Sequence, residues 1–334
     1  MSSDSAVDVE ALAQGILAGQ RAALAKAITL VESTRPEAAE RGWQLLERVL
    51  PHTGKSLRIG VTGVPGVGKS TFIEAFGLML IERGHRVAVL AVDPSSRISG
   101  GSILGDKARM SKLAQSDEAY IRPSPNATTL GGVARRTREA LLLVEAAGFD
   151  VVLVETVGVG QSEISVCDMT DFFLVLMLPG AGDELQGIKK GIIELADLIA
   201  VNKADGGTKI AAEAACAEYA AALSYLRPQH EDWQPRALCV SSLKKRGLDA
   251  IWDAVLGQRK ALKARGRFET RRQEQRRTWF WAELDAGLRA SFLGRRGFKD
   301  EVDEVEGEVV NGSLSPSRAA RRLLSSFWGG QDLT

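Results

Sequence analysis

The sequence is poor in cysteine and histidine, the residues from which proteins build disulfides and soft-metal sites. Its 334 residues include three cysteines and three histidines. The cysteines, Cys167, Cys216 and Cys239, lie far apart and form no C-x-x-C pair. This pattern is typical of a protein from a reducing compartment, and it offers no metal-ligand spacing.

The chain also lacks a net charge and a long apolar run. Lys and Arg number 43 and Asp and Glu 42, which leaves a formal charge of +1. No global field therefore favours nucleic acid or an anionic membrane. The first residues lack the basic and apolar regions of a secretory signal, and apolar runs such as 172–178 are too short to cross a bilayer. We expect a cytoplasmic protein with neither a membrane nor a nucleic-acid partner.

Between residues 57 and 262, short β-branched runs alternate with longer stretches of helical periodicity. This alternation is typical of βαβ units. The run at 171–178 is apolar almost throughout, as expected of a strand that helices cover on both faces. The pattern predicts an α/β fold with a mostly parallel central sheet flanked by helices. We predict strands at residues 57–63, 86–92, 118–122, 150–156, 171–178, 197–202 and 236–240.

The first predicted strand leads into a phosphate-binding loop. Residues 63–70 fit the pattern G-x-x-x-x-G-K-[ST], and a helical stretch follows. Backbone N–H groups of such a loop surround phosphate oxygens, Lys69 reaches the β and γ phosphates, and the Ser70 hydroxyl is a ligand for Mg²⁺. We therefore expect a P-loop NTPase fold. The nucleotide would be held by Gly63, Val64, Pro65, Gly66, Val67, Gly68, Lys69, Ser70 and Thr71.

Helical patterns flank this nucleotide-binding region on both sides. Apolar residues recur at helical spacing between residues 7 and 50, which predicts two or three helices, with Pro36 in the first turn of the last. We expect a helical extension at 1–55, the P-loop domain at 56–262 and a C-terminal helical arm at 263–334.

A second motif indicates which base is bound. The strand at 197–202 leads into Asn202, Lys203, Ala204 and Asp205, an N-K-x-D sequence. Asp205 can accept hydrogen bonds from N1 and the N2 amine of guanine, whereas adenine would leave its carboxylate unpaired. GTP and GDP are therefore favoured over ATP. Lys203 would lie against the base while Asn202 braces the loop, and Ser241, Ser242 and Leu243 would cap guanine O6.

The strand at 150–156 ends in a motif that resembles a nucleotide switch. Glu155 precedes Gly158 by three residues, as in D-x-x-G with Glu in place of Asp. Glu155 can hold a Mg²⁺-bound water, and the Gly158 N–H can bind the γ phosphate. The next residue is Val159, where small signalling GTPases carry a water-orienting glutamine. We expect slow unaided hydrolysis, with the missing group supplied from elsewhere in the chain or by a partner.

Further charged residues follow other strands. Asp93 and Asp106 are carboxylates at the catalytic edge, and helix capping is the alternative role for both. The loop at 179–190 is dense in charge. It can swing Asp183 or Lys189 toward the phosphates, or it is simply solvated.

After residue 256 the pattern predicts one long, basic, amphipathic helix that includes Trp279, Phe280 and Trp281. Nucleic-acid binding is disfavoured because the acidic segment 300–306 follows. The aromatic stripe is better placed against the main domain or a second subunit. A last helix begins with Ser315 as N-cap and Pro316 at N1.

Together these motifs closely resemble the MeaB/ArgK GTPases, the G-protein chaperones of methylmalonyl-CoA mutase. The resemblance rests on residues 63–70, 92–96, 100–107, 155–163 and 202–205. It implies a homodimer, formed through the C-terminal arm, that binds the adenosylcobalamin-dependent mutase, gates delivery of the cofactor with GTP, and protects or rescues the mutase.

The resemblance also implies roles for individual residues. Mg²⁺ would be held by Ser70, Asp93, Asp106 and Glu155. Lys69, Asp93, Glu155, Asp183 and Lys189 would serve catalysis, and Asp183, Gln186 and Lys189 would form a third switch that answers to the mutase.

Two other functions fit parts of the sequence. A metallochaperone GTPase would load a metal into a client enzyme, but such proteins usually carry Cys or His clusters, which this chain lacks. A small-molecule kinase would use ATP equally well, and Asp205 argues against that.

Overall fold

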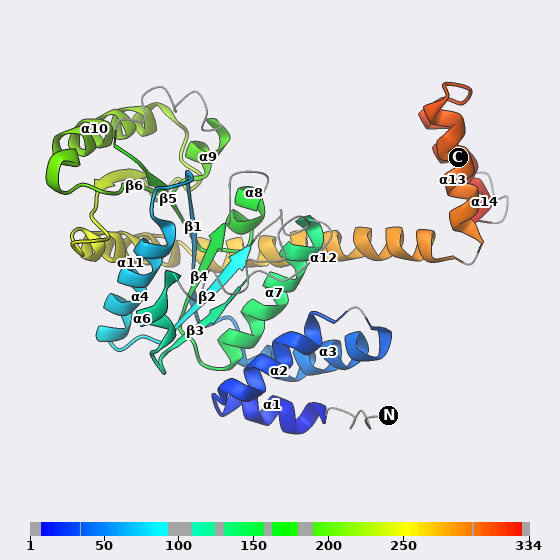
Figure 1. Ribbon diagram of the computed structural model, residues 1–334, viewed down its shortest axis with the longest axis horizontal. Helices are drawn as coiled ribbons and strands as arrows, with labels where there is room; N and C mark the ends of the chain where they lie inside the picture. Colours follow the sequence, from blue (N-terminus) through cyan, green and yellow to red (C-terminus); the bar gives the residue numbers. More distant parts are fainter. Residues whose placement is uncertain are drawn as a thin grey trace. The chain divides into compact units, whose positions relative to one another are not determined.

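A seven-stranded parallel sheet forms the centre of the protein (Figure 1). The computed structural model describes residues 8–33, 35–92, 109–123, 130–156, 162–179, 190–295 and 297–328. The sheet order is β3-β2-β4-β1-β5-β6-β7, and each neighbouring pair is parallel. The strands are β1 (Leu57–Gly63), β2 (Val87–Val92), β3 (Ala119–Arg122), β4 (Val151–Thr156), β5 (Phe172–Met177), β6 (Leu198–Val201) and β7 (Arg236–Cys239).

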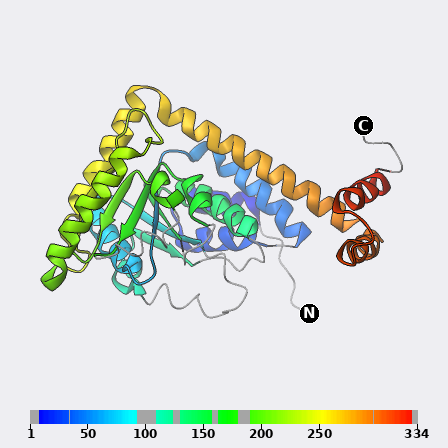
Figure 2. The same ribbon diagram turned by 90° about the horizontal axis from the view of Figure 1, so that it is seen from above.

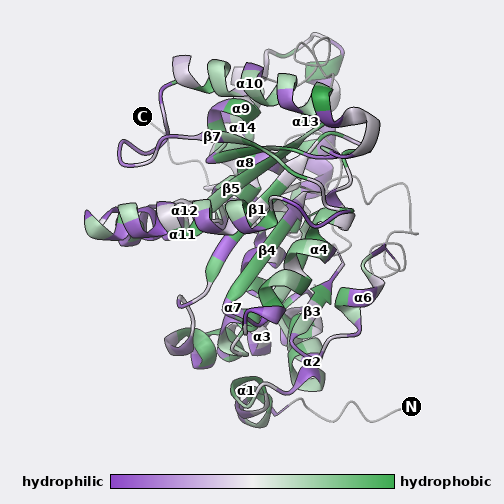
Figure 3. Cartoon of the chain, turned by 90° about the vertical axis from the view of Figure 1, so that its left-hand side faces the viewer, coloured by the Kyte–Doolittle hydropathy of each residue, from purple (hydrophilic) through white to green (hydrophobic). Residues whose placement is uncertain are grey.

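The predicted strands are confirmed, each to within one or two residues. Strands β4 and β5 are apolar over most of their length, which Figure 3 shows as green ribbons. Because successive side chains point to opposite faces, one set packs against helices on each side. In β4, for example, Val151 and Leu153 join one core cluster while Val152 and Val154 join the other. The result is a three-layer α/β fold.

Helices cover both faces of this sheet. One core cluster joins the sheet to α4 (Lys69–Glu82), α6 (Ser111–Ala114) and α11 (Leu248–Ala264). The other joins it to α7 (Leu130–Ala146), α8 (Ser162–Cys167), α9 (Lys190–Leu195) and α10 (Lys209–Tyr225). Single-turn helices η1 (Leu50–His52) and η2 (Gly206–Thr208) complete the connections.

Three N-terminal helices add a further layer, as the sequence predicts (Figures 1 and 2). They are α1 (Val9–Leu17), α2 (Arg21–Val31) and α3 (Pro36–Val49), with Pro36 in the first turn of α3. All three contact α7, and Glu32 at the end of α2 also pairs with Arg122 of β3. Leu24 and Leu45 are almost fully buried there, and they share the core cluster of α7.

The prediction of one long basic helix after residue 256 is wrong. The chain instead forms α11, which ends at Ala264, and α12 (Arg267–Gly294). Gly266 separates them with φ of +70°, a left-handed conformation that glycine adopts without a Cβ penalty. Its N–H bonds the Lys263 carbonyl at 3.1 Å, which closes the last turn of α11.

The start of α12 is anchored at the edge of the sheet where β1 and β5 begin. Arg272 donates Nε and Nη2 to the two carboxylate oxygens of Asp171, at 2.8 and 2.6 Å, and Nη2 also donates to the Ser56 carbonyl at 2.6 Å. Asp171 in turn accepts from the Arg58 N–H at 2.8 Å. Burial alone would raise the pKa of Asp171, but its hydrogen bonds with Arg272 hold it below the usual value. Both charged groups of this buried ion pair are thus hydrogen-bonded, which offsets the cost of removing them from water.

The neighbouring arginine, Arg271, lies beside Asp197 and His230. Asp197 accepts from the Phe173 N–H at 2.8 Å and lies 4.0 Å from Arg271, which also bonds His230. Burial raises the pKa of Asp197 to about 6, against the charge of Arg271. Burial, and after it the charges of Arg271 and Arg267, lower the pKa of His230 to about 4.

The contacts divide the chain into two compact units, residues 1–272 and 273–334. In the second unit, α13 (Phe298–Val310) and α14 (Pro316–Phe327) pack on each other. Phe292, Phe298 and Phe327 form its aromatic centre, with ring centroids 4.6 to 5.7 Å apart. The Ser315 hydroxyl caps α14 by accepting from the Arg318 N–H, as predicted. The predicted boundaries at residues 55/56 and 262/263 stay a prediction. Within the described ranges, no helix is long and apolar enough to cross a membrane.

Candidate functional site

The phosphate loop connects β1 to α4 at the carboxyl end of the sheet, where ligands bind in such folds. Gly68 immediately precedes α4 with φ of +88°, a conformation that a residue with a Cβ rarely adopts. Val67 is fully buried and holds the loop to the core. Lys69 and Ser70 occupy the first turn of α4, so the helix N-terminus, with its partial positive charge, is at the loop. This arrangement can bind a phosphate chain.

The side chain of Lys69 is held inside this loop. Its Nζ donates to the Gly63 carbonyl oxygen at 2.7 Å. Burial lowers the pKa of Lys69 below its usual value, whereas the charges of Glu155 and Glu163 raise it. A nucleotide phosphate that replaced the Gly63 carbonyl as acceptor would add a negative charge beside this ammonium group.

Two buried glutamates therefore act on Lys69, and the sequence interpretation assigned a role to one of them. Glu155 is 5% exposed near the end of β4, where it pairs in register with Val61 of β1. Glu163 is 1% exposed in the first turn of α8. In the sequence, the one indication of a role for Glu163 is its position at the end of the motif 155–163. The structure adds that its side chain is buried, and buried carboxylates almost always have a partner.

Asn202 ties the phosphate loop to the predicted base-binding loops. Its Nδ2 donates to the Val67 carbonyl at 2.8 Å, and its Oδ1 accepts from the Ser242 N–H at 3.1 Å and from the Ser242 hydroxyl at 2.9 Å. Asn202 is 2% exposed. The bracing role predicted for this side chain thus corresponds to three buried hydrogen bonds that link three segments far apart in the sequence.

Asp205 and Ser241 also lie together. The Ser241 hydroxyl donates to Asp205 Oδ2 and accepts from the Lys244 N–H at 3.1 Å. Lys203 has φ of +59°, unusual for a residue with a Cβ, and the Ala204 N–H bonds the Val240 carbonyl at 2.9 Å. The two predicted base-binding segments therefore meet. Leu243 is 73% exposed, and its side chain is apolar. Its backbone N–H is therefore the group that could bind a polar atom of a ligand.

Other predicted site residues lie outside the described residues. They are Asp93, Asp106, Gly158, Asp183, Gln186 and Lys189. Asp93 follows β2 directly, and the last residue of β2, Val92, pairs with Thr156 at the end of β4. Their assignments stay predictions.

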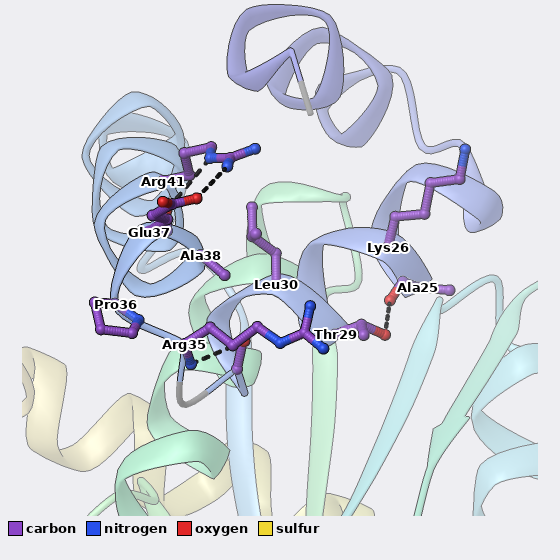
Figure 4. A pocket seen from close by; sticks show the side chains of 10 residues that line it. Ala25, Lys26, Thr29, Leu30, Arg35, Pro36, Glu37, Ala38 and Arg41 are labelled. Carbon is purple, nitrogen blue, oxygen red and sulfur yellow. Dashed lines mark hydrogen bonds and ion pairs between the residues drawn. The ribbon is translucent and has the colours of Figure 1, made fainter. Parts of the chain in front are cut away.

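A groove of about 980 Å³ lies between α2 and α3 (Figure 4). Arg41 and Glu37 pair on one side at 3.7 Å, and Lys26 lines the other. None of the predicted nucleotide-site residues lines this groove. Within the described part of the chain, no group of three or more His, Cys, Asp or Glu residues is arranged to hold a metal ion.

Comparison with known proteins gives consistent matches. A sequence profile of the family described as "Methylmalonyl Co-A mutase-associated GTPase MeaB" matches residues 24–294. GTPase ArgK of Escherichia coli K12 is 49% identical over 309 residues, which cover 92% of this chain and 93% of that protein. The mitochondrial methylmalonic aciduria type A homolog of Mus musculus is 47% identical, over 96% of this chain and 79% of that protein. A crystal structure of an LAO/AO transport system kinase is 41% identical with a TM-score of 0.76, and it covers 96% of this chain and 97% of that one.

Proposed function

The chain belongs to the MeaB family of methylmalonyl-CoA mutase-associated GTPases, and from that premise we propose a chaperone function for it. It is a P-loop GTPase. We propose that it uses GTP to gate the loading of adenosylcobalamin onto methylmalonyl-CoA mutase, and that it protects or reactivates the mutase. The mouse relative, named for methylmalonic aciduria, supports a connection with methylmalonyl metabolism.

The observation that carries the nucleotide assignment is the hydrogen-bond system of Asn202. It brings Asp205 and the loop 241–243 into one assembly with the phosphate loop. In this proposal guanine N1 and its N2 amine donate to Asp205, the Leu243 N–H bonds O6, and Lys203 lies against the ring. An adenine base would leave the Asp205 carboxylate without these donors, which is how binding sites discriminate steeply.

The residues near the phosphate loop also fit a hard divalent cation. Ser70 offers a hydroxyl oxygen and Glu155 a buried carboxylate whose charge reaches Lys69, and such oxygen ligands suit Mg²⁺. We propose that Ser70, Asp93, Asp106 and Glu155 hold this ion, directly or through water. When bound, the ion would supply charge neutralisation on the β and γ phosphates.

The chain's own residues then bind and orient the triphosphate. Lys69 would exchange its bond to the Gly63 carbonyl for the β and γ phosphates, and the Gly158 N–H would sense the γ phosphate. Val159 cannot orient water, so unaided hydrolysis would be slow. In the proposal the mutase stimulates hydrolysis by ordering the third switch with Asp183, Gln186 and Lys189. A Lys189→Ala change would then keep nucleotide affinity and abolish stimulation, and a stimulated rate that stays unchanged would remove Lys189 from the mechanism.

The second unit supports a homodimer. Phe280, Trp281, Leu284 and Leu288 repeat at helical spacing on α12, and their exposed fractions range from 39% to 60%. Contiguous exposed apolar side chains of this kind are typical of a protein–protein interface and uncommon on a solvent-exposed surface. We propose that these side chains form the interface with a second copy.

The test of the base assignment is the Asp205→Asn variant. Its preference for GTP over ATP should fall steeply because the amide cannot accept both guanine donors as a carboxylate does. Retained selectivity would refute the assignment. The test of the chaperone function is transfer of adenosylcobalamin into apo-mutase, followed by absorbance, with GTP or GDP bound to the protein. A transfer rate independent of the nucleotide would refute gating.

A further inference from the structure

Two buried threonine hydroxyls join the strand that leads to the phosphate loop with the strand that carries Glu155. Thr62 is the next-to-last residue of β1, and Thr156 is the last residue of β4. Their Oγ1 atoms lie 2.8 Å apart, in a hydrogen bond in which either hydroxyl can donate. Thr62 is 1% exposed and Thr156 is fully buried. Neither hydroxyl reaches water, and among the described residues each has the other as its hydrogen-bond partner.

This pair lies on the opposite face of the sheet from Glu155. In the β1–β4 ladder, Val61 pairs with Glu155, and Thr62 and Thr156 come one residue later. Side chains alternate between the two faces along a strand, and Val61 packs in the core cluster that includes α4. The threonines therefore face the side on which α8 contacts β1 and β4. On that face they lie away from the Glu155 side chain, so any effect of the pair on Glu155 passes through the backbone.

Each threonine is the immediate neighbour in sequence of a residue of the nucleotide site. Thr62 precedes Gly63, whose carbonyl oxygen accepts from Lys69 Nζ at 2.7 Å. Thr156 follows Glu155 and, in the sequence, immediately precedes the residues of the predicted second switch. The hydroxyl bond thus fixes the carboxyl ends of β1 and β4 relative to each other.

We propose that Thr62 and Thr156 are a positioning pair for GTP hydrolysis. Their bond holds the backbone at Gly63 and the backbone at Glu155 at a fixed spacing, so that the Lys69 ammonium group and the Glu155 carboxylate keep their relative positions at the triphosphate. The inference rests on the proposed function in one respect, the role of Glu155 at the metal-bound triphosphate. A displacement of reacting groups by a fraction of an ångström is enough to slow a step that depends on alignment.

A purely structural role is the alternative, since a buried hydrogen-bonded pair also stabilises strand register. Valine is the informative substitution because it keeps the shape of threonine and removes the hydroxyl. The variants are Thr62→Val, Thr156→Val, the double Val variant, and the two Ser variants, which keep the hydroxyl. The matched control is Thr137→Val in α7, where a fully buried hydroxyl donates to the Val133 carbonyl at 2.9 Å.

The measurements are kcat and KM for GTP, the affinity for a fluorescent GDP analogue, and the thermal unfolding midpoint. Each single Val variant should lower kcat about tenfold and leave KM and GDP affinity within about twofold, as expected for an interaction that serves only the transition state. The double variant should resemble the singles because both residues serve one bond. The Ser variants keep the hydroxyl, so their kcat should stay close to that of the unmodified protein. The Thr137→Val control should lower the unfolding midpoint with kcat unchanged.

The proposal is overturned if kcat of both Val variants stays within about twofold of the unmodified protein. It is also overturned if the two losses multiply in the double variant, or if Thr137→Val lowers kcat equally. The double Val variant leaves no unpaired hydroxyl, so it keeps the test decisive if a single variant folds poorly. Guanine selectivity and Mg²⁺ dependence of the unmodified protein test the proposed function separately, since neither depends on the threonine bond.

Discussion

Replacing Asn202 by alanine should weaken both the fold and nucleotide binding, by an amount that its three hydrogen bonds allow us to work out. The change removes the bonds to the Val67 carbonyl, the Ser242 N–H and the Ser242 hydroxyl. All of these groups are in buried surroundings, and each bond contributes about 1 kcal/mol net, so the free energy of unfolding should fall by about 3 kcal/mol. Because the three segments are joined before any ligand is present, most of this loss should appear in the protein without nucleotide.

The same change should lower GTP affinity, because the ligand must then order loops that Asn202 no longer joins. If one of the three bonds reaches its full strength in the unmodified protein only when nucleotide binds, its loss lowers the binding free energy by about 1 kcal/mol. The affinity then falls by less than about tenfold, since each 1.4 kcal/mol is a factor of ten. Urea denaturation gives the first quantity and titration with a fluorescent GTP analogue the second.

The matched control is Ser242→Ala, which removes the hydroxyl bond and keeps the N–H bond to Asn202 Oδ1. It should cost about 1 kcal/mol. The reasoning is refuted if Asn202→Ala costs no more than Ser242→Ala, because the bond to the phosphate loop would then contribute nothing.

Three further predictions concern the buried charged groups near the start of α12 and the exposed aromatic residues on α12. Arg272→Ala should lower the free energy of unfolding by roughly 3 to 5 kcal/mol, because it leaves the Asp171 carboxylate buried without its ion pair; a loss below 1 kcal/mol in urea denaturation would contradict this. His230 has a pKa of about 4 in the folded state against 6.5 ordinarily, so the unfolded chain binds more protons between these values and the contribution of His230 to stability rises with pH across that window. Asp197, raised to about 6, should act in the opposite direction between about 4 and 6. Denaturation of His230→Gln and Asp197→Asn against the unmodified protein at pH 4, 5, 6 and 7 should show differences of opposite slope, and equal slopes would refute the assignments. Phe280→Glu should shift the protein toward monomer in light scattering, whereas an unchanged mass would place the interface elsewhere.

The central fold could be predicted because its signals are local and strong. A parallel strand buried on both faces must be largely apolar, and β5 (Phe172–Met177) and the first four residues of β4 satisfy this. The break between α11 and α12 was missed because glycine is tolerated inside helices, and the sequence does not show that Gly266 adopts a left-handed φ. Basic and apolar periodicity continues on both sides of it, so the pattern alone favours one helix.

The site was predictable to the extent that its chemistry lies in contiguous motifs. The N-K-x-D sequence predicted that Asn202 braces the loop, but the bond from Asn202 to the Val67 carbonyl joins residues 135 positions apart and has no local signal. The hydrogen bond between Thr62 and Thr156 likewise has no local signal, and the motif 155–163 contains Glu163 without showing that its carboxylate is buried near Lys69. Their significance comes from burial and strand register, which only the assembled sheet shows.

The most direct test of the central claim is GTP turnover by the purified protein, measured with and without methylmalonyl-CoA mutase and with ATP in parallel. We expect a slow basal rate with GTP, a rise of severalfold or more when the mutase is present, and negligible turnover of ATP. GTP hydrolysis that the mutase leaves unchanged would contradict the proposal that this partner completes the catalytic site.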